Sequence, residues 1–351
     1  MPRVLLLLLL LCAALATPAR AQIKASVVYR NLVMEGGGIR GIAYGGALAE
    51  LEKQGVLAGI RRVGGTSAGA IQAALLAVGY SPAEIIAVVN EMPVQRLNDG
   101  RLMFFGGSTR LLKQYGWYRG DQFTSFMSEL VARKTGSPDL TLAQLHDLAS
   151  QGKARDLYTT GTNLTRQCVQ VFSYETHPEM RVADAVRISM SIPLYFRAVL
   201  LDAQGYVVRQ PAKDQAVEVL VDGGLLANYP VDLFDKPQYL PASTAASPAA
   251  VNPETLGLRL DRAEQIAYDT LANGRQQLAP YTINSFGSYV GALYNVALEN
   301  LNPARPADWP RTVSISTAGF NPKIKRISAA QKQQLMDSGR LGVQQFLSRQ
   351  L

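Results

Sequence analysis

The chain is 351 residues long, with 48% hydrophobic and 18% charged residues and a formal net charge of +8. This composition excludes an intrinsically disordered or fibrous chain and predicts one sizeable core, or one domain with insertions. Lysine and arginine are scattered along the sequence and form no stripe, so nucleic acid is not an expected partner. No histidine or cysteine spacing indicates a metal site, and no cofactor is expected.

The first 21 residues have the pattern of a secretory signal peptide. Arg3 gives a positive start, residues 4–16 are apolar, and residues 19–21 form an Ala-x-Ala site that predicts cleavage before Gln22. The apolar stretch is too short to span a bilayer comfortably, so we expect export to a periplasm or to the outside. Cleavage leaves Cys168 as the single cysteine, which excludes an intramolecular disulfide.

A glycine-rich loop follows a β-rich run over residues 27–34 and leads into a helical pattern over 42–54. The loop consists of Gly36, Gly37, Gly38, Ile39, Arg40 and Gly41. Three of its glycines also fit G-x-G-x-x-G, the fingerprint of dinucleotide binding, which requires an acidic residue at the end of the second strand. That strand ends without a carboxylate, so the clustered amides better fit an oxyanion hole.

The second strand candidate, residues 60–63, runs into Gly65, Thr66, Ser67, Ala68 and Gly69. This segment matches the G-x-S-x-G turn that holds a nucleophilic serine between a strand and a helix. The residues that follow, to Val78, have helical spacing, which completes the strand, turn and helix. Ser67 is therefore the candidate nucleophile, and the alternative is a turn of small residues with an inert serine.

A capping box at residues 81–84 predicts a helix to about Asn90. Residues 93–120 mix large apolar side chains, Phe104 and Phe105 among them, with glycines and arginines. Two interpretations remain open for this stretch. It forms a lid that faces lipid, or its aromatic residues pack onto the core under a long loop.

The middle of the chain predicts a strand pair, residues 158–163 and 169–173, and a hairpin over 200–220 around Gly205. This hairpin leads to Asp222, Gly223 and Gly224, which place a carboxylate at a strand end. Asp222 is a candidate base, and the alternative is an ordinary Asp-Gly turn.

The C-terminal part predicts a proline-, alanine- and serine-rich surface linker or insertion over 237–253 and a strand over 256–260. Helices are expected over 263–278, 283–301 and 328–347.

Together these segments resemble the patatin-like phospholipase family, whose signatures are G-G-G-x-[RK]-G, G-x-S-x-G and D-G-[AG], in that order. The likeness extends to residues 185–193, to Asn228, Pro230 and Val231, and to residues 315–347. It covers roughly residues 28–350, with core motifs over about 28–235, and predicts a single domain over 22–351. A small departure is Glu35, where many members have aspartate. The implied fold is a three-layer α/β fold with a central, largely parallel sheet flanked by helices.

The resemblance implies a serine–aspartate dyad of Ser67 and Asp222, with Gly36, Gly37, Gly38 and Arg40 around the oxyanion and Gly41, Gly65, Gly69, Gly223 and Gly224 supporting the motifs. The histidine count is an independent check, because only His146 and His177 are present and neither follows Asp222. An ordinary α/β-hydrolase places its histidine after the acid, so that triad is excluded. Arg40 either adds positive charge near the ester or is structural.

The implied function is a serine acyl hydrolase for phospholipid or other lipid esters, in peripheral contact with a membrane surface. The alternatives are a lipid-binding relative without activity and a dinucleotide-dependent oxidoreductase. The intact nucleophile, base and glycine loop argue against the first, and the missing acidic residue argues against the second.

Overall fold

The computed structural model of the protein describes residues 27–92, 98–100, 110–242, 244, 250–301, 303, 305–321 and 326–350. The expected signal peptide lies outside the described residues. So do Phe104 and Phe105 of the expected lid, and residues 243 and 245–249 of the expected insertion.

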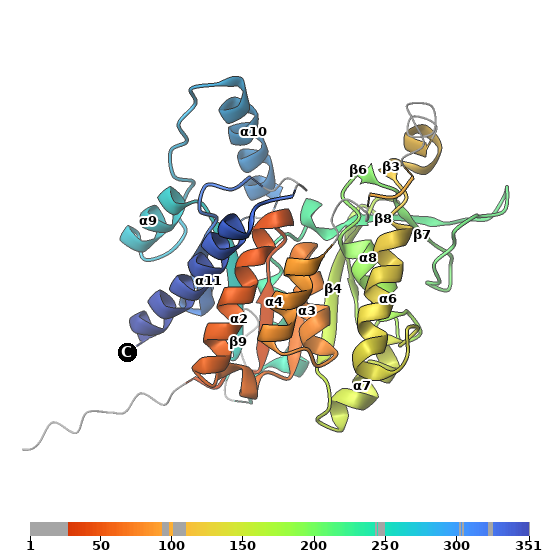
Figure 1. The fold of residues 1–351 in the computed structure, drawn as a ribbon, viewed down its shortest axis with the longest axis horizontal. Coiled ribbons are helices and arrows are strands. Elements are labelled where there is room, and N and C mark those ends of the chain that lie inside the picture. The colour runs from red at the N-terminus through yellow and green to blue at the C-terminus, as the bar shows by residue number, and fades with distance from the viewer. Residues whose placement is uncertain are drawn as a thin grey trace, which may run out of the picture.

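A sheet of eight strands forms the middle of the molecule (Figure 1). Its strands are β1 (Asn31–Met34), β2 (Arg62–Gly65), β4 (Asp156–Asn163), β5 (Cys168–Phe172), β7 (Val199–Leu201), β8 (Glu218–Asp222), β9 (Thr255–Asp261) and β10 (Thr312–Ser316). The order is β10-β9-β1-β2-β4-β8-β7, with β5 also paired to β4. Neighbours from β10 to β4 are parallel, and β5, β7 and β8 pair antiparallel. The predicted α/β fold with its central sheet is confirmed.

Helices are arranged around this sheet (Figure 1). They are α2 (Ala43–Lys53), α3 (Ala68–Ala77), α4 (Pro82–Glu91), α6 (Asp121–Thr135), α7 (Leu142–Ser150), α8 (Val182–Ser189), α9 (Ala263–Leu271), α10 (Phe286–Leu301) and α11 (Ala329–Gln350). α3 packs on β2 and β4, α8 on β4, and α11 on β10 and α2. No helix within the described ranges combines the length and the apolar run needed to cross a bilayer.

The two faces of the sheet have separate cores, because successive side chains of a strand point to opposite faces. On β1, Leu32 and Met34 join the large core under the long helices. Val33 points to a smaller core with Tyr158, Leu233, Phe234 and Tyr239. The last three belong to the 3-10 helices η4 (Val231–Phe234) and η5 (Pro237–Tyr239), which form the third layer.

Several predicted elements differ in extent from those observed. The expected helix over 263–278 ends at Leu271, because Gly274 adopts φ 132° and Arg275 turns inward to pair with buried Asp261 and Asp269. The expected hairpin over 200–220 is formed by β7 and β8, which pair antiparallel; the turn at Gly205 lies in the long connection between them, which adds a single bridge between Leu201 and Val207. The capping box predicted at Ser81 is confirmed.

The expected insertion over 237–253 has buried residues near both of its ends. Tyr239 lies in the smaller core, and the amide of the fully buried Asn252 donates to the carbonyls of Phe234 and Tyr239. Its two ends are therefore part of the folded layer, and the prediction of a surface linker is wrong for them.

A separate two-stranded ribbon pairs β3 (Gly116–Tyr118) with β6 (Leu194–Phe196). It projects from the same end of the molecule as α10 (Figure 1).

Candidate active site

Strand pairing brings the ends of β2 and β8 together. β2 runs parallel to β4 and ends at Gly65, opposite Thr159, whereas β8 runs antiparallel to β4 and ends at Asp222, opposite Gly161. Both Thr159 and Gly161 also pair with β5, so β2 and β8 occupy the same side of β4. The two strands meet head to head, which places Ser67, just beyond the end of β2, next to Asp222.

Ser67 lies at the sharp turn between β2 and α3, with φ 52° and ψ −117°. It is the N-cap residue of α3, but its side chain makes no capping hydrogen bond. The turn is tight, because a Cβ at Gly65 would lie 2.6 Å from the Gly69 carbonyl carbon and one at Gly69 would collide with the Met34 carbonyl. These contacts explain why the turn needs both glycines, and they leave the Ser67 hydroxyl uncommitted to the helix.

Asp222 is buried, and its carboxylate faces Ser67. Its Oδ1 accepts a hydrogen bond of 2.7 Å from the Gly224 amide, and the Ser67 hydroxyl donates to the same carboxylate. Burial raises the pKa of Asp222 to about 7, against the lowering effect of these two donors. A carboxylate with this pKa is a far stronger base than an ordinary aspartate and is substantially ionised at neutral pH.

Thr160, the β4 residue between the two strand ends, ties them together. Its hydroxyl lies 2.6 Å from the hydroxyl of Thr66. A Cβ at Gly223 would collide with the Thr160 side chain and backbone, so the chain can leave Asp222 in this direction only through glycine.

The C-terminal end of α8 contacts both candidate residues, and no motif in the sequence indicated this. The Ser189 hydroxyl accepts a hydrogen bond of 3.0 Å from the backbone amide of Ser67. The Ser191 carbonyl accepts one of 2.9 Å from the backbone amide of Asp222. Buried Arg187 donates to the Ser191 hydroxyl and fixes that turn. The only sequence signal was the likeness of residues 185–193 to the family.

We expect Ser189→Ala to lower kcat for ester hydrolysis about tenfold with little change in KM. The buried Ser67 amide loses its acceptor, which costs about 1–3 kcal/mol of stability and loosens the nucleophile. Ser173→Ala is the matched control, because Ser173 is equally buried and its hydroxyl accepts the Glu175 amide away from the site. Kinetics and thermal unfolding of both variants are the measurement. Equal loss of turnover in both would contradict a positioning role for Ser189.

The glycine-rich loop lies against Ser67, but its amides are not equivalent. The Gly36 amide donates to the Asn228 carbonyl at 2.9 Å, so it is not a free donor, and the expectation that Gly36 binds an oxyanion is not supported. A Cβ at Gly36 would lie 3.4 Å from the Ser67 Cβ and would collide with the Asn228 side chain. Gly36 thus permits the close approach of loop and nucleophile.

Arg40 bends back onto its own loop. Its Nε donates to the Gly37 carbonyl at 3.1 Å, and its backbone amide donates to the same oxygen at 3.2 Å. In a trans peptide the carbonyl and the following N–H point in opposite directions, so this contact fixes the direction of the Gly38 N–H. Gly38 has φ 55° and lines the same cavity as Ser67. This geometry favours a structural role for Arg40, and the Gly38 N–H donates to no other described residue.

Buried Glu35 secures the base of this loop. Its Oε2 accepts the Leu260 amide of β9 at 2.6 Å, and its Oε1 accepts the Asn228 side-chain amide at 3.0 Å. Burial raises the pKa of Glu35, and the charge of Arg259 opposes that rise.

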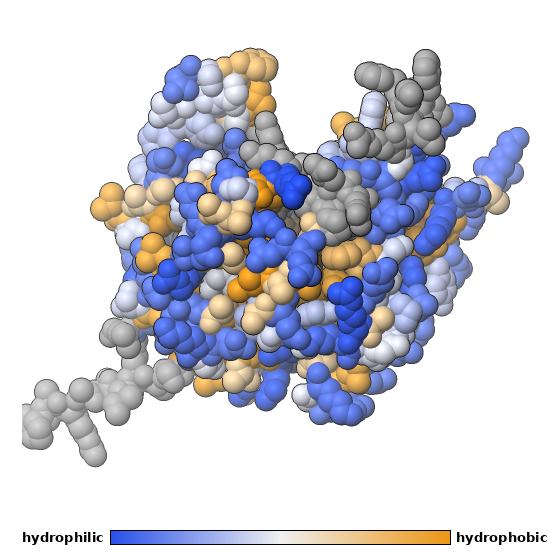
Figure 2. Space-filling model, viewed as in Figure 1, coloured by the Kyte–Doolittle hydropathy of each residue, from blue (hydrophilic) through white to orange (hydrophobic). Residues whose placement is uncertain are grey.

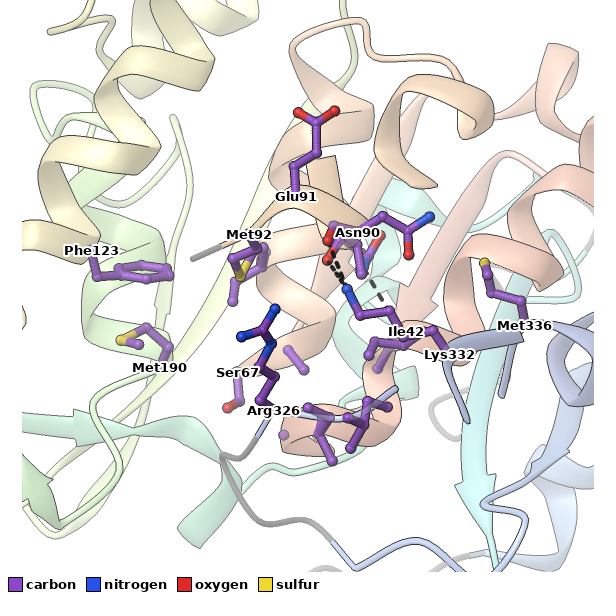
Figure 3. A pocket seen from close by; sticks show the side chains of 18 of the residues that line it. Ile42, Ser67, Asn90, Glu91, Met92, Phe123, Met190, Arg326, Lys332 and Met336 are labelled. Carbon is purple, nitrogen blue, oxygen red and sulfur yellow. Dashed lines mark hydrogen bonds between the residues drawn. The ribbon is translucent and has the colours of Figure 1, made fainter. Parts of the chain in front are cut away.

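A cavity of about 970 Å³ opens above Ser67 (Figure 3). Its apolar walls are formed by Ile39, Ile42, Ile71, Met92, Phe123, Met190, Ile192, Phe196, Ile327 and Met336. Two cations also line it. The Lys332 amine donates to the Asn90 carbonyl at 2.7 Å, whereas Arg326, which lines the cavity together with Ser67, has no hydrogen bond or ion pair with another described residue. The volume of the cavity and its apolar walls suit an acyl chain, and its two cations suit an anionic group near the reacting ester.

Neither histidine lines this cavity. His146 pairs with Asp156 at 2.8 Å and stacks on Tyr174, and His177 contacts the Gln170 amide. The part of the chain that the structure describes contains no group of three or more metal-ligating side chains.

Comparisons with known proteins match this chain over most of its length. The sequence model described as "Patatin-like phospholipase" matches residues 32–235, more than half of the chain. "Uncharacterized protein YqhO" of Bacillus subtilis is 34% identical over 61% of this chain and 69% of its own length. "Probable lipid hydrolase 463L" of Invertebrate iridescent virus 6 is 27% identical over 59% of this chain and 64% of its own.

Two solved structures share the fold. VipD from Legionella pneumophila superposes with a TM-score of 0.59 at 16% identity, covering 92% of this chain and 67% of that one. ExoU in its complex with SpcU, from Pseudomonas aeruginosa, gives a TM-score of 0.52 at 21% identity, covering 92% of this chain and 52% of that one. Each has substantial further length that the superposition does not cover.

Proposed function

Because the chain belongs to the patatin-like phospholipase family, we propose that it is a serine acyl hydrolase that cleaves carboxylic ester bonds of lipids, of the phospholipase A or lysophospholipase type. The observation that carries this proposal is the buried Asp222 carboxylate facing the Ser67 hydroxyl at the floor of an apolar cavity. The lipid-hydrolase name of the viral relative supports the same reaction class.

In this mechanism Asp222 accepts the Ser67 hydroxyl proton as Ser67 Oγ attacks the ester carbonyl carbon. The tetrahedral intermediate collapses when the alcohol leaves, and Asp222 returns the proton to it. Water then attacks the acyl-enzyme, Asp222 accepts the water proton, and Ser67 leaves with a proton as the fatty acid is released.

The developing oxyanion would be bound by amides of the loop, with Gly38 and Gly37 as the donors. In the described residues neither amide donates a hydrogen bond to the protein, and Arg40 holds the peptide between them. Donors fixed in this way stabilise charge that develops only in the transition state.

The test is the hydrolysis of phospholipid vesicles by purified residues 22–351, with the released fatty acid and lysolipid identified by mass spectrometry. Acyl release that depends on Ser67 would support the proposal. Silence on vesicles, on neutral lipids and on short-chain esters would contradict it and favour a lipid-binding protein without activity.

We expect Arg326→Gln to reduce the preference for phospholipid over monoacylglycerol about tenfold. Arg326 lines the same cavity as Ser67 and pairs with no other described residue, and a charge-assisted bond to a headgroup phosphate is worth about 1.5–3 kcal/mol. The ratio of kcat/KM on lysophosphatidylcholine and on monoacylglycerol is the measurement. Arg340→Gln on α11 is the control, because Arg340 is an exposed arginine paired with Asp337. An unchanged ratio in Arg326→Gln would remove Arg326 from headgroup recognition.

We also propose that the protein is exported through residues 1–21 and contacts membranes peripherally. Residues 22–351 would act as one domain. β9 and β10 lie beyond the segment that the family model matches and pair into the same sheet as β1, which supports this proposal.

A further inference from the structure

Helix α10 exposes a row of apolar side chains. They are Phe286, Tyr289, Val290, Leu293 and Val296. Phe286 is 82% exposed and Leu293 is 53% exposed. Glu299 is the only charged residue of the helix, and it is paired with Arg259 at 2.8 Å and Arg275 at 3.0 Å. The helix is thus anchored at its C-terminal end, and its outer part presents apolar surface with no charged side chain, which usually marks an interaction site.

The β3–β6 ribbon exposes apolar residues whose backbone conformation is unfavourable. Tyr115, just before β3, has φ 62°, and Leu194, the first residue of β6, has φ 67°. Large side chains rarely adopt this left-handed conformation. Both residues are nevertheless exposed, Leu194 by 68%, so burial of their side chains does not offset the backbone strain. Strain of this kind is found where a side chain must be presented in a fixed direction.

Both apolar surfaces belong to elements that adjoin the candidate active site. α10 packs against η3 (Gly223–Leu225), the turn that directly follows Asp222. Phe196 of β6 and the nearby Ile192 form part of the cavity wall. In Figures 1 and 2, α10 and the ribbon stand on opposite sides of a hollow, and hydrophobic residues lie along the side of α10 that faces it.

We propose that these two surfaces form a docking surface for a phospholipid bilayer, with Phe286, Tyr289, Val290 and Leu293 on one side and Tyr115 and Leu194 on the other. The inference rests on the proposed function, because it takes the lipid ester as the substrate of the cavity. The apolar side chains enter the outer leaflet, and the mouth of the cavity faces the lipid between them.

The position of the two surfaces favours a bilayer over a protein partner. A protein or a second copy of this chain that covered both surfaces would also cover the hollow and close the path to Ser67. A bilayer covers both and supplies substrate through the same opening. The absence of unpaired charge on α10 agrees with insertion into the acyl region, where charged groups are costly.

Vesicle flotation tests the proposal, with all variants made in a Ser67→Ala background so that no lipid is consumed. The vesicles are phosphatidylcholine with phosphatidylglycerol. The combined change Phe286→Ser and Leu293→Ser is expected to weaken vesicle binding about tenfold or more, because the apolar area transferred from water is lost. Leu341→Ser on α11 is the control, since Leu341 is 52% exposed and should not affect binding.

Leu194→Gly gives a second, independent result. Glycine adopts the positive φ freely, so this variant should bind vesicles more weakly without any fall in Tm. With Ser67 intact, all docking variants should hydrolyse a soluble short-chain ester at the parent rate. If neither the parent protein nor any variant hydrolyses that ester, the result counts against the proposed function alone. Vesicle binding that is unchanged in both docking variants would overturn the inference. If the parent protein sediments as a dimer and the docking variants sediment as monomers, the surface would instead be a contact with a second copy of the chain.

Discussion

Ser67→Ala is expected to abolish ester hydrolysis, with a fall in kcat of roughly 10⁵-fold or more, and to preserve the fold. The variant removes the oxygen that would form the acyl-enzyme. The hydroxyl makes no capping bond to α3, and alanine at φ 52° carries about the same strain as serine, so the start of the helix should be preserved. The buried Asp222 carboxylate loses one hydrogen-bond donor, which should cost about 1 kcal/mol of stability. Hydrolysis of a soluble ester and thermal unfolding are the two measurements.

Ser81→Ala is the matched control, because Ser81 is also a helix N-cap but holds a complete capping box on α4. It should lose about 1 kcal/mol of stability and keep full activity. Loss of activity in Ser67→Ala but not in Ser81→Ala, at a similar cost in stability, separates a chemical role from a structural one. Residual turnover near the parent level in Ser67→Ala would remove Ser67 as the nucleophile.

Asp222→Asn is expected to lower kcat by about 10²- to 10⁴-fold, because the amide cannot accept the hydroxyl proton. The substitution keeps the size of the side chain and an Oδ1 acceptor for the Gly224 amide, so the turn should be preserved. In the parent protein kcat/KM should rise with pH and level off above about pH 7, where the carboxylate is ionised. A parent profile that is flat between pH 5 and 9, or an asparagine variant with normal turnover, would exclude Asp222 as the base.

The same substitution has a predictable effect on stability. The pKa of Asp222 is raised in the folded state, so its contribution to stability is present at low pH and is lost as pH rises through about 7. Asparagine avoids the cost of burying this charge. Asp222→Asn should therefore raise Tm relative to the parent at pH 8 and have little effect at pH 3, below the pKa of about 3.9 that aspartate has in an unfolded chain. Thermal unfolding at the two pH values measures the difference.

The sequence predicted those parts of the structure that are determined by short local motifs. The turn around Ser67, the glycine loop and the strand that ends at Asp222 all follow from short motifs. The structure places the first two at one cavity and the buried Asp222 against Ser67. Contacts made through the fold could not be read in the same way. The use of the Gly36 amide by Asn228 joins positions 192 residues apart, and no local pattern marks it.

The end of α9 could not be predicted from the sequence either, because it depends on buried ion pairs. Helical spacing continued past Leu271, but the pairing of Arg275 with Asp261 and Asp269 overrode it. An inward-facing arginine of this kind becomes apparent only when its carboxylate partners are placed in space.

Because β2 and β8 meet head to head along β4, β4 sets the distance between Ser67 and Asp222. Thr160 alone separates the β4 positions opposite Gly65 and Asp222, so the spacing of nucleophile and base is a property of a third strand. One residue added to β4 at this point would separate the two strand ends by about 3.3 Å and reverse the face of the residues beyond it. The largely exposed loop that leads into β8 can change length, whereas this short stretch of β4 cannot.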